Sequence, residues 1–325
     1  MKKAALLLTV LVVMCAAVEA VILLQVHPDP TRLAAILLSL TLTLCAFVGM
    51  SQSSLLRYLR QQAVGSVWAA AGVPLFLLIP YLVYALGTGC FTWLGAGKLL
   101  AYILAPTLLL LPDRLHRPAH LGWRDVVAML ALALPVAANW LGGIWTWPFD
   151  LYFFRPLFCV CVGMYAFVVV RNLEGVGYRL LWRKQDVMDG FANFLAFSLF
   201  GIPLGMALHF IHPHFSSASL GQFPLQFFGI YFTIAIPEEL LFRGILQNLL
   251  CQTIQRGPRG VYGLLIASVI FGASHLHHAP VPNWRYAILA TLAGVFYGYT
   301  YRNRQRISAS ALTHALVDTA WHFWF

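Results

Sequence analysis

Charged side chains are scarce in this sequence. Only 10% of its 325 residues are Asp, Glu, Lys or Arg, whereas soluble domains usually carry about 25%. Hydrophobic residues make up 60% of the chain, and its mean hydropathy is +0.77. The shortage of charge excludes a soluble globular protein and indicates an integral membrane protein. No low-complexity segment or internal repeat interrupts this composition.

A cysteine framework is also lacking. No two cysteines are spaced as Cys-x-x-Cys, and most of them lie inside or at the edges of apolar runs. This distribution favours buried free thiols over a disulfide framework or a cysteine nucleophile. The residues concerned are Cys15, Cys45, Cys90, Cys159, Cys161 and Cys251.

A basic patch is absent too, although the formal net charge is +10. The Lys and Arg residues form short clusters between apolar runs, which is typical of membrane topology and not of phosphate binding. We therefore expect the lipid bilayer, and no nucleic acid, as the partner of these charges.

Eleven apolar segments of about 17–22 residues follow one another along the chain. Every second connection carries Lys or Arg, so the positive-inside rule predicts a cytoplasmic N-terminus and, after eleven spans, an outside C-terminus. The first run is too long for a typical signal peptide and is expected to be an uncleaved helix. The predicted fold is an all-α, polytopic transmembrane helical bundle, with segments near 4–25, 33–50, 63–86, 89–111, 125–142, 151–170, 191–212, 226–250, 261–276, 286–301 and 307–324.

The longest polar connection, from about Arg171 to Gly190, is predicted to be cytoplasmic and divides the chain. Before it, charges inside apolar runs are few and isolated. After it, charged and imidazole side chains collect inside apolar helices, where they are expensive and usually functional. We therefore expect an N-terminal region of about six helices at 1–184, of unknown role, and a functional core at 185–325.

The core contains a charged motif, Glu238, Glu239 and Arg243, within an apolar run. Each ionised side chain at mid-bilayer costs about 2.5–3.5 kcal/mol, so the motif needs partners or a water-filled cavity. Glu239 and Arg243 are four residues apart, in the acid-before-base order that allows pairing on a helix. Glu238 points about 100° away from Glu239 and is free to face another group. One paired and one free carboxylate suggest a chemical site.

Three later residues, His275, His314 and Asp318, match Glu238 in membrane depth. With helices of alternating direction that rise about 1.5 Å per residue, all four lie about 10–21 Å above the cytoplasmic edge of a ~30 Å core. Alternating helices could have scattered these side chains across the bilayer. Their shared depth therefore favours a single site.

These motifs resemble those of the CPBP (Abi, CAAX-protease-like) family of intramembrane proteases. The resemblance covers about residues 185–325 and includes the stretch from Gly294 to Tyr299. It implies a glutamate-dependent intramembrane endopeptidase that acts on a membrane-associated or lipid-anchored protein. The family motifs Glu-Glu-x-x-x-Arg, Phe-x-x-x-His and His-x-x-x-Asp/Asn occur in this order, as Glu238-Glu239 with Arg243, Phe271 with His275, and His314 with Asp318.

The resemblance also implies a role for each site residue. Glu238 and His275 would hold and deprotonate a water molecule. Glu239, paired with Arg243, would hold the helix and the local field in place. His314 would donate a hydrogen bond to the developing oxyanion.

Asp318 would orient His314 by accepting its other N–H. Many family members carry Asn at this position, and an Asn side chain can donate to an oxyanion whereas an ionised Asp cannot. We expect no cofactor, and we expect the protein in the cytoplasmic membrane of a bacterium.

Other interpretations stay open at this point. The same Glu, His, His and Asp could bind zinc, although the chain has no His-Glu-x-x-His. A proton-coupled transporter would use them as a relay, which should extend across the membrane. A non-catalytic immunity or scaffold protein would leave them unused. Outside the motifs, Phe271 is expected to pack against imidazole, His277 and His278 to lie solvated at the outer interface, and Trp321–Phe325 to form an interfacial belt.

Overall fold

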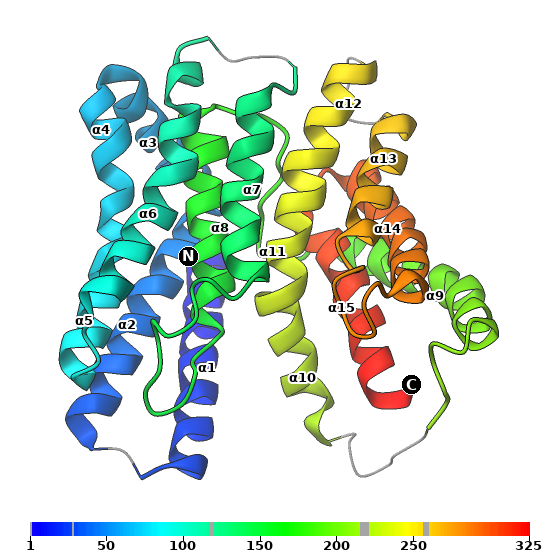
Figure 1. Ribbon diagram of the computed structural model, residues 1–325, viewed down its shortest axis with the longest axis horizontal. Coiled ribbons are helices and arrows are strands. Elements are labelled where there is room, and N and C mark those ends of the chain that lie inside the picture. Colours follow the sequence, from blue (N-terminus) through cyan, green and yellow to red (C-terminus); the bar gives the residue numbers. More distant parts are fainter. Residues whose placement is uncertain (1, 28, 117–119, 215–220, 256–259) are drawn as a thin grey trace. The chain divides into compact units, whose positions relative to one another are not determined.

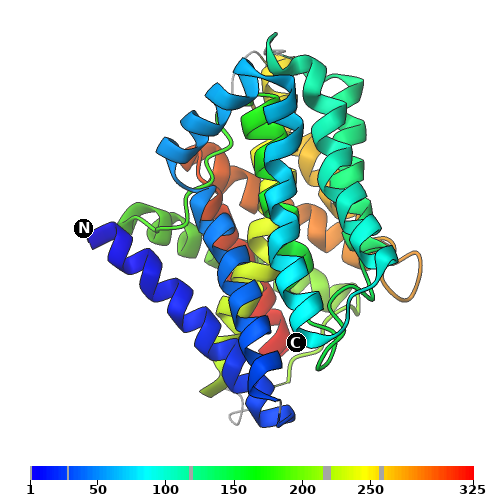
Figure 2. The same ribbon diagram turned by 90° about the vertical axis from the view of Figure 1, so that its left-hand side faces the viewer.

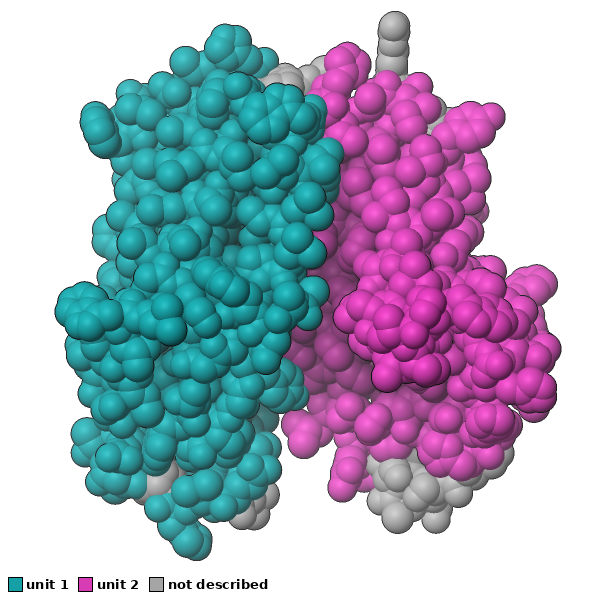
Figure 3. Space-filling view, in the orientation of Figure 1, with its two compact units in different colours: residues 1–118, 122–173 teal, residues 119–121, 174–325 magenta. Residues whose placement is uncertain are grey.

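The computed structural model describes residues 2–27, 29–116, 120–214, 221–255 and 260–325, and within them the chain is helical and contains no strand (Figure 1). The all-α prediction is confirmed for this part of the chain. Two compact units are present, one of residues 1–118 and 122–173, the other of residues 119–121 and 174–325 (Figure 3). The predicted functional core begins inside the second of these units.

The first unit is arranged around a helix that is buried along its whole length. This helix, α8 (Phe154–Gly163), continues into the π-helical turn η3 (Met164–Val170). It is surrounded by α2, α3, α6 and α7, and α1 meets α2 near its C-terminal end and diverges toward its N-terminus (Figure 2). The other elements are α1 (Lys2–Gln25), α2 (Pro30–Gly49), α3 (Ser53–Gly65), α4 (Val67–Gly72), η1 (Val73–Leu77), α5 (Leu78–Thr88), α6 (Trp93–Leu110), η2 (Leu111–Arg114) and α7 (Trp123–Ala137).

The second unit is arranged around α15 (Ile307–Trp324), against which α9, α10 and α14 pack (Figure 1). The charged motif lies in one continuous helical segment, from α10 to α12. This segment has one π-helical stretch before the two glutamates and one after them. Such π-turns are frequent at functional sites. The elements are α9 (Lys184–Ala207), α10 (Phe223–Ile230), η5 (Tyr231–Ala235), α11 (Ile236–Glu239), η6 (Leu240–Gln247), α12 (Asn248–Gln255), α13 (Val261–Ala273) and α14 (Trp284–Arg304).

Each of the eleven predicted apolar segments coincides with a helical stretch of the described chain. By length and composition, five of the described helices could cross a membrane, namely Pro30–Gly49, Val67–Thr88, Trp93–Arg114, Lys184–Ala207 and Phe223–Ile254. Val12–Leu23, Phe154–Val170 and Val261–Ala273 are shorter apolar helices. The number of spans and the orientation of the N-terminus stay predictions.

Two helical regions extend beyond what hydropathy predicts. Helix α3 lies largely in a predicted connection. It is amphipathic and contains Arg and Gln residues, so its mean hydropathy is too low for it to be recognised as an apolar segment. Helix α9 begins at Lys184, before the apolar segment at 191–212, because the Asp186 carboxylate accepts a hydrogen bond of 2.8 Å from the backbone N–H of Arg183 and caps a polar first turn.

The polar connection before α9 is not a solvated loop. Residues 174–183 belong to no helix or strand, and Val176 and Tyr178 within them are buried. The backbone N–H of Ile307 donates to the carbonyl of Gly177 at 3.0 Å, and the Tyr301 hydroxyl donates to the carbonyl of Gly175 at 2.6 Å. We call residues 174–183 the strap, because they are bound in this way to α14 and α15.

Glycine is required in the strap by geometry. Gly177 has a φ of +70°, and a Cβ atom there would lie 2.1 Å from the carbonyl oxygen of Gln305. Only glycine combines this backbone conformation with such a close approach. At the same end of the unit, Arg306 forms an ion pair of 2.8 Å with Asp186. The strap and the start of α9 are thus held against the turn between α14 and α15.

Candidate active site

The two adjacent glutamates face different surroundings. The side chain of Glu239 is fully buried, and its Oε2 lies 3.3 Å from Nε of Arg243, so the pair predicted from the i,i+4 spacing is present. The side chain of Glu238 is 35% exposed and lines a cavity. The 100° turn between neighbours on a helix separates one structural carboxylate from one accessible carboxylate.

Arg243 is buried inside the second unit. Its guanidinium is fully buried and lies 5.0 Å above the ring of Phe271. An aromatic face attracts a cation, and this contact adds to the attraction of the Glu239 carboxylate. Phe271 also packs edge-on against the rings of His275, at 4.7 Å, and His314, at 5.8 Å. The phenyl ring therefore separates the two histidines from the arginine and has the packing role expected from the sequence.

His314 is held between three carboxylates. Its Nδ1 lies 3.0 Å from Oε1 of Glu239, and its Nε2 lies 3.3 Å from Oδ2 of Asp318 and 3.9 Å from Oε2 of Glu238. A carboxylate can only accept a hydrogen bond, so both contacts are attractive when both ring nitrogens carry a proton. The ring of Tyr297 stacks on the imidazole at 4.5 Å and fixes its plane.

The ring nitrogens of His275 have other partners than those of His314. It lies in the turn after α13, and its Nδ1 donates to the backbone carbonyl of Phe271 at 2.8 Å. A carbonyl oxygen can only accept, so the proton is on Nδ1 and Nε2 keeps its lone pair. His275 therefore offers a base, whereas His314 offers a donor.

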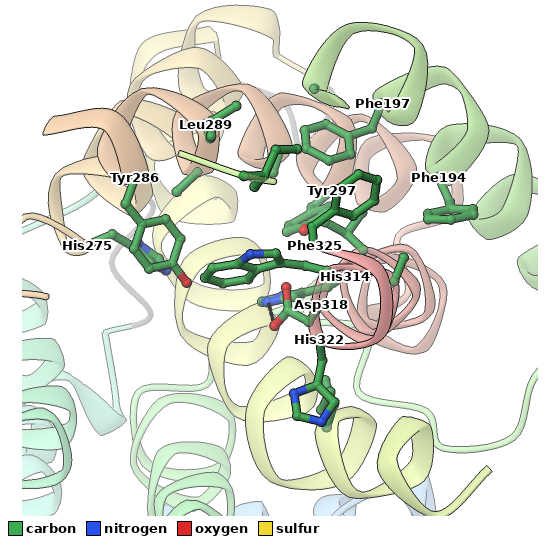
Figure 4. A pocket seen from close by; sticks show the side chains of 18 of the residues that line it. Phe194, Phe197, His275, Tyr286, Leu289, Tyr297, His314, Asp318, His322 and Phe325 are labelled. Carbon is green, nitrogen blue, oxygen red and sulfur yellow. Dashed lines mark ion pairs between the residues drawn. The ribbon is translucent and has the colours of Figure 1, made fainter. Parts of the chain in front are cut away.

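A cavity of about 670 Å³ connects these groups. Four of the six predicted site residues line it, while Glu239 and Arg243 lie buried behind them. Figure 4 shows His275 on one side of this cavity and His314 with Asp318 on the other. The remaining wall is mostly aromatic and aliphatic, and includes Phe194, Phe197, Ile202, Phe210, Ile230, Ile234, Tyr286, Leu289, Tyr297 and Trp321.

The C-terminal aromatic residues, predicted from the sequence to form an interfacial belt, also line the cavity. Trp321, His322 and Phe325 line the cavity, and Figure 4 labels the last two. Trp324 contacts Phe223. Trp321 follows Asp318 by three residues, and this spacing on a helix places both on one face. That periodicity is the signal that could have identified Trp321 from the sequence.

Two further cavity residues were not identified from the sequence as site residues. His278 is exposed, as expected of a loop residue, yet it also lines the cavity and lies with its ring centre 5.7 Å from that of His275. Tyr286 packs edge-on against His275 at 4.5 Å. Tyr286 carries no sequence signal, because an aromatic residue near a helix start is common in membrane helices.

Comparisons with known proteins found a matching family for one part of the chain. A comparison with curated proteins and one with solved structures found no match. Among protein-family models, that of the Rce1-like type II CAAX prenyl endopeptidases matches residues 220–320. This range contains all three motifs, and the resemblance inferred from them is confirmed there. Residues 220–320 thus carry an Rce1-like domain of the CAAX protease family, which supports a peptidase in an integral membrane protein.

Proposed function

We propose that the protein is an intramembrane endopeptidase that hydrolyses a peptide bond of a membrane-associated or lipid-anchored protein, using a water molecule activated by Glu238 and His275. One observation carries the proposal: an accessible carboxylate and two imidazoles from separate helical stretches line one largely apolar cavity. The family match supports a membrane endopeptidase at the level of the family.

Water activation is assigned to Glu238 and His275 because both offer acceptors in the cavity. As the water oxygen bonds to the carbonyl carbon, one of these bases takes its proton and the carbonyl oxygen becomes an oxyanion. The proton then passes to the amide nitrogen, the carbon–nitrogen bond breaks, and an amine and a carboxylic acid are released. General base catalysis of this kind contributes about 10²–10⁴-fold.

Glu239 acquires a second role beside its ion pair with Arg243. Its contact of 3.0 Å with Nδ1 of His314 fixes the orientation of that ring. The N–H at Nε2 is then the one left to face a substrate, and Asp318, at 3.3 Å, shares it. We therefore propose that Glu239, more than Asp318, orients His314, and that Nε2–H is its donor to the oxyanion.

The lining of the site supports a class of substrate. An aromatic and aliphatic wall suits apolar side chains or a lipid anchor. The matching family is described as prenyl endopeptidases, so a prenylated C-terminal peptide is the first substrate to test. We propose the cytoplasmic membrane of a bacterium as the location; the alternating basic connections support an integral membrane protein with a defined cytoplasmic side.

We also propose that the reaction needs no metal ion. Zinc sites take three or more nitrogen, sulfur or oxygen ligands with free lone pairs. Nε2 of His314 lies 3.3 Å from Oδ2 of Asp318, which holds a proton on this nitrogen, so Nε2 of His275 is the one imidazole lone pair beside the carboxylates of Glu238 and Asp318. Within the described ranges, no group of three or more His, Cys, Asp or Glu side chains is arranged to hold a metal.

The test compares wild type with Glu238→Gln, which keeps the shape of the side chain and removes its charge. Both proteins are reconstituted in liposomes and incubated with membrane fractions of the source organism, with and without a metal chelator. New peptide termini are then identified by mass spectrometry. A farnesylated peptide that ends in Cys-aliphatic-aliphatic-X serves as a defined probe in parallel.

The expected result is a set of termini that wild type produces in chelator and that Glu238→Gln does not produce. Identical termini from both proteins would assign cleavage to a contaminant. An absence of termini, together with an uncut probe, would overturn the proposed function. Loss of cleavage in chelator alone would overturn the metal-independent mechanism and leave the peptidase in place.

A further inference from the structure

The carboxylates of the proposed site gather around one imidazole nitrogen. Glu238 and Asp318 line the cavity, and both carboxylates lie within 3.9 Å of the same atom, Nε2 of His314. Peptide hydrolysis creates a further negative charge, the oxyanion, in this cavity. Fixed hydrogen-bond donors are the usual means of stabilising such a charge. The Nε2–H of His314 is already contacted by Asp318, so a further donor beside it would help to stabilise the oxyanion.

Tyr286 is held rigidly at the edge of this site. Its backbone N–H donates to Oδ1 of Asn283 at 3.0 Å, which caps the first turn of α14. The Asn283 backbone N–H in turn donates to the carbonyl of Leu276 at 3.0 Å. The phenol ring contacts the rings of His275 at 4.5 Å and Trp321 at 5.3 Å. Cap and ring contacts together fix the direction of the side chain.

The Tyr286 hydroxyl is directed into the cavity, between His275 and the His314–Asp318 pair (Figure 4). A phenol keeps its proton at neutral pH and can donate it in a hydrogen bond. Two other hydroxyl groups of the cavity wall are less suited. Ser198 already donates to the carbonyl of Phe194 at 2.8 Å, and Tyr297 is only 1% exposed and lies flat on His314.

We propose that Tyr286 is a further catalytic residue, whose hydroxyl donates a hydrogen bond to the oxyanion beside the Nε2–H of His314. This inference rests on the proposed peptidase function. Tyr286 forms and breaks no covalent bond and keeps its proton throughout: the water proton passes through Glu238 or His275 to the leaving nitrogen. Its hydroxyl supplies a second donor in a site where the residue one turn after His314 is an acceptor.

The test replaces the hydroxyl alone. Tyr286→Phe keeps every ring contact, and Tyr299→Phe on the exposed side of the same helix is the matched control. Cleavage of the farnesylated peptide probe is measured as kcat and KM for wild type and both variants in liposomes. Loss of one oxyanion donor lowers kcat by about 10²–10³-fold, so we expect this loss for Tyr286→Phe with little change in KM. Thermal unfolding in detergent confirms that each variant is folded.

A second pair of variants separates donation from packing. Asp318→Asn introduces an amide donor one turn from His314, so the loss caused by Tyr286→Phe should shrink to about tenfold or less in an Asp318→Asn background. A kcat of Tyr286→Phe equal to that of Tyr299→Phe would overturn the inference. So would an undiminished loss in the Asp318→Asn background, because it would assign Tyr286 a purely structural role.

Failure of the inference and failure of the proposed function give different results. If wild type cuts the probe, Glu238→Gln does not, and Tyr286→Phe cuts it at the wild-type rate, only the role of Tyr286 is wrong. If wild type cuts neither the probe nor any protein of the membrane fraction, the proposed function is wrong and the inference falls with it.

Discussion

Oε1 of Glu239 lies 3.0 Å from Nδ1 of His314, although 75 positions separate the two residues in the chain. The other oxygen of the same carboxylate lies 3.3 Å from Nε of Arg243. One buried carboxylate therefore links the arginine of its own helix to the histidine of α15. It has both a structural and a positioning role, and these can be separated by mutation.

Glu239→Leu alone should destabilise the protein and inactivate it. Removing one partner of a buried ion pair typically costs about 3–5 kcal/mol, because the remaining charge is left uncompensated. Adding Arg243→Met should restore most of the stability, yet activity should stay lost because His314 has no acceptor at Nδ1. Unfolding in detergent, followed by tryptophan fluorescence, and probe cleavage measure the two effects. Recovery of activity in the double variant would show that Glu239 has no positioning role.

Two histidines two positions apart should differ sharply in their effect on the rate. His275→Gln removes the proposed base and should lower kcat by about 10²–10⁴-fold. His277→Gln should leave it unchanged, because His277 is exposed and its Nδ1 contacts the carbonyl of Ser274 at 2.6 Å. Both variants are compared on the peptide probe. Equal rates for the two would contradict water activation by His275.

Helices α13 and α14 approach each other closely at Gly272. A Cβ atom there would lie 1.8 Å from Oγ1 of Thr291 and 2.5 Å from the carbonyl oxygen of Ala287. Gly272→Ala should therefore force the helices apart and destabilise the protein by about 1–3 kcal/mol. Gly229→Ala in α10 is the control, since a Cβ atom there meets nothing within 4 Å. An equal melting temperature for both variants would contradict the close contact.

The predicted orientation can be tested with reporters fused to truncated chains. Green fluorescent protein fused after Lys184 should fluoresce, because that connection is predicted to be cytoplasmic, and alkaline phosphatase there should be inactive. Phosphatase fused after Pro280 should be active, because the loop between α13 and α14 is predicted to lie outside. The opposite pattern at both sites would invert the topology.

Much of this architecture could be predicted from local sequence. Apolar segments form helices because backbone groups in a bilayer must be satisfied within their own segment. The Glu239–Arg243 pair follows from an i,i+4 spacing on one helix. The convergence of Glu238, His275, His314 and Asp318 on one cavity agrees with the common depth zone predicted for them from the sequence.

The contacts that depend on the rotation of each helix about its axis could not be predicted. Depth alone does not say that Nδ1 of His314 meets Glu239, or that Tyr286 turns into the cavity. The C-terminal aromatic residues were expected at the interface because Trp and Tyr are enriched there. Composition does not say toward which side of the helix each ring points. The strap was predicted only to be a cytoplasmic connection, because a polar sequence does not reveal that its carbonyls find donors on α14 and α15.

The strap also has a consequence for how this domain can be isolated or transferred between proteins. A fragment that starts at the first turn of α9 has every helix of the second unit, yet it lacks the acceptors for Ile307 and for the Tyr301 hydroxyl. It also uncovers the buried turn where α15 begins. We therefore expect that a fragment of the second unit keeps its fold only if it starts at or before Glu174, at a residue that belongs to no helix.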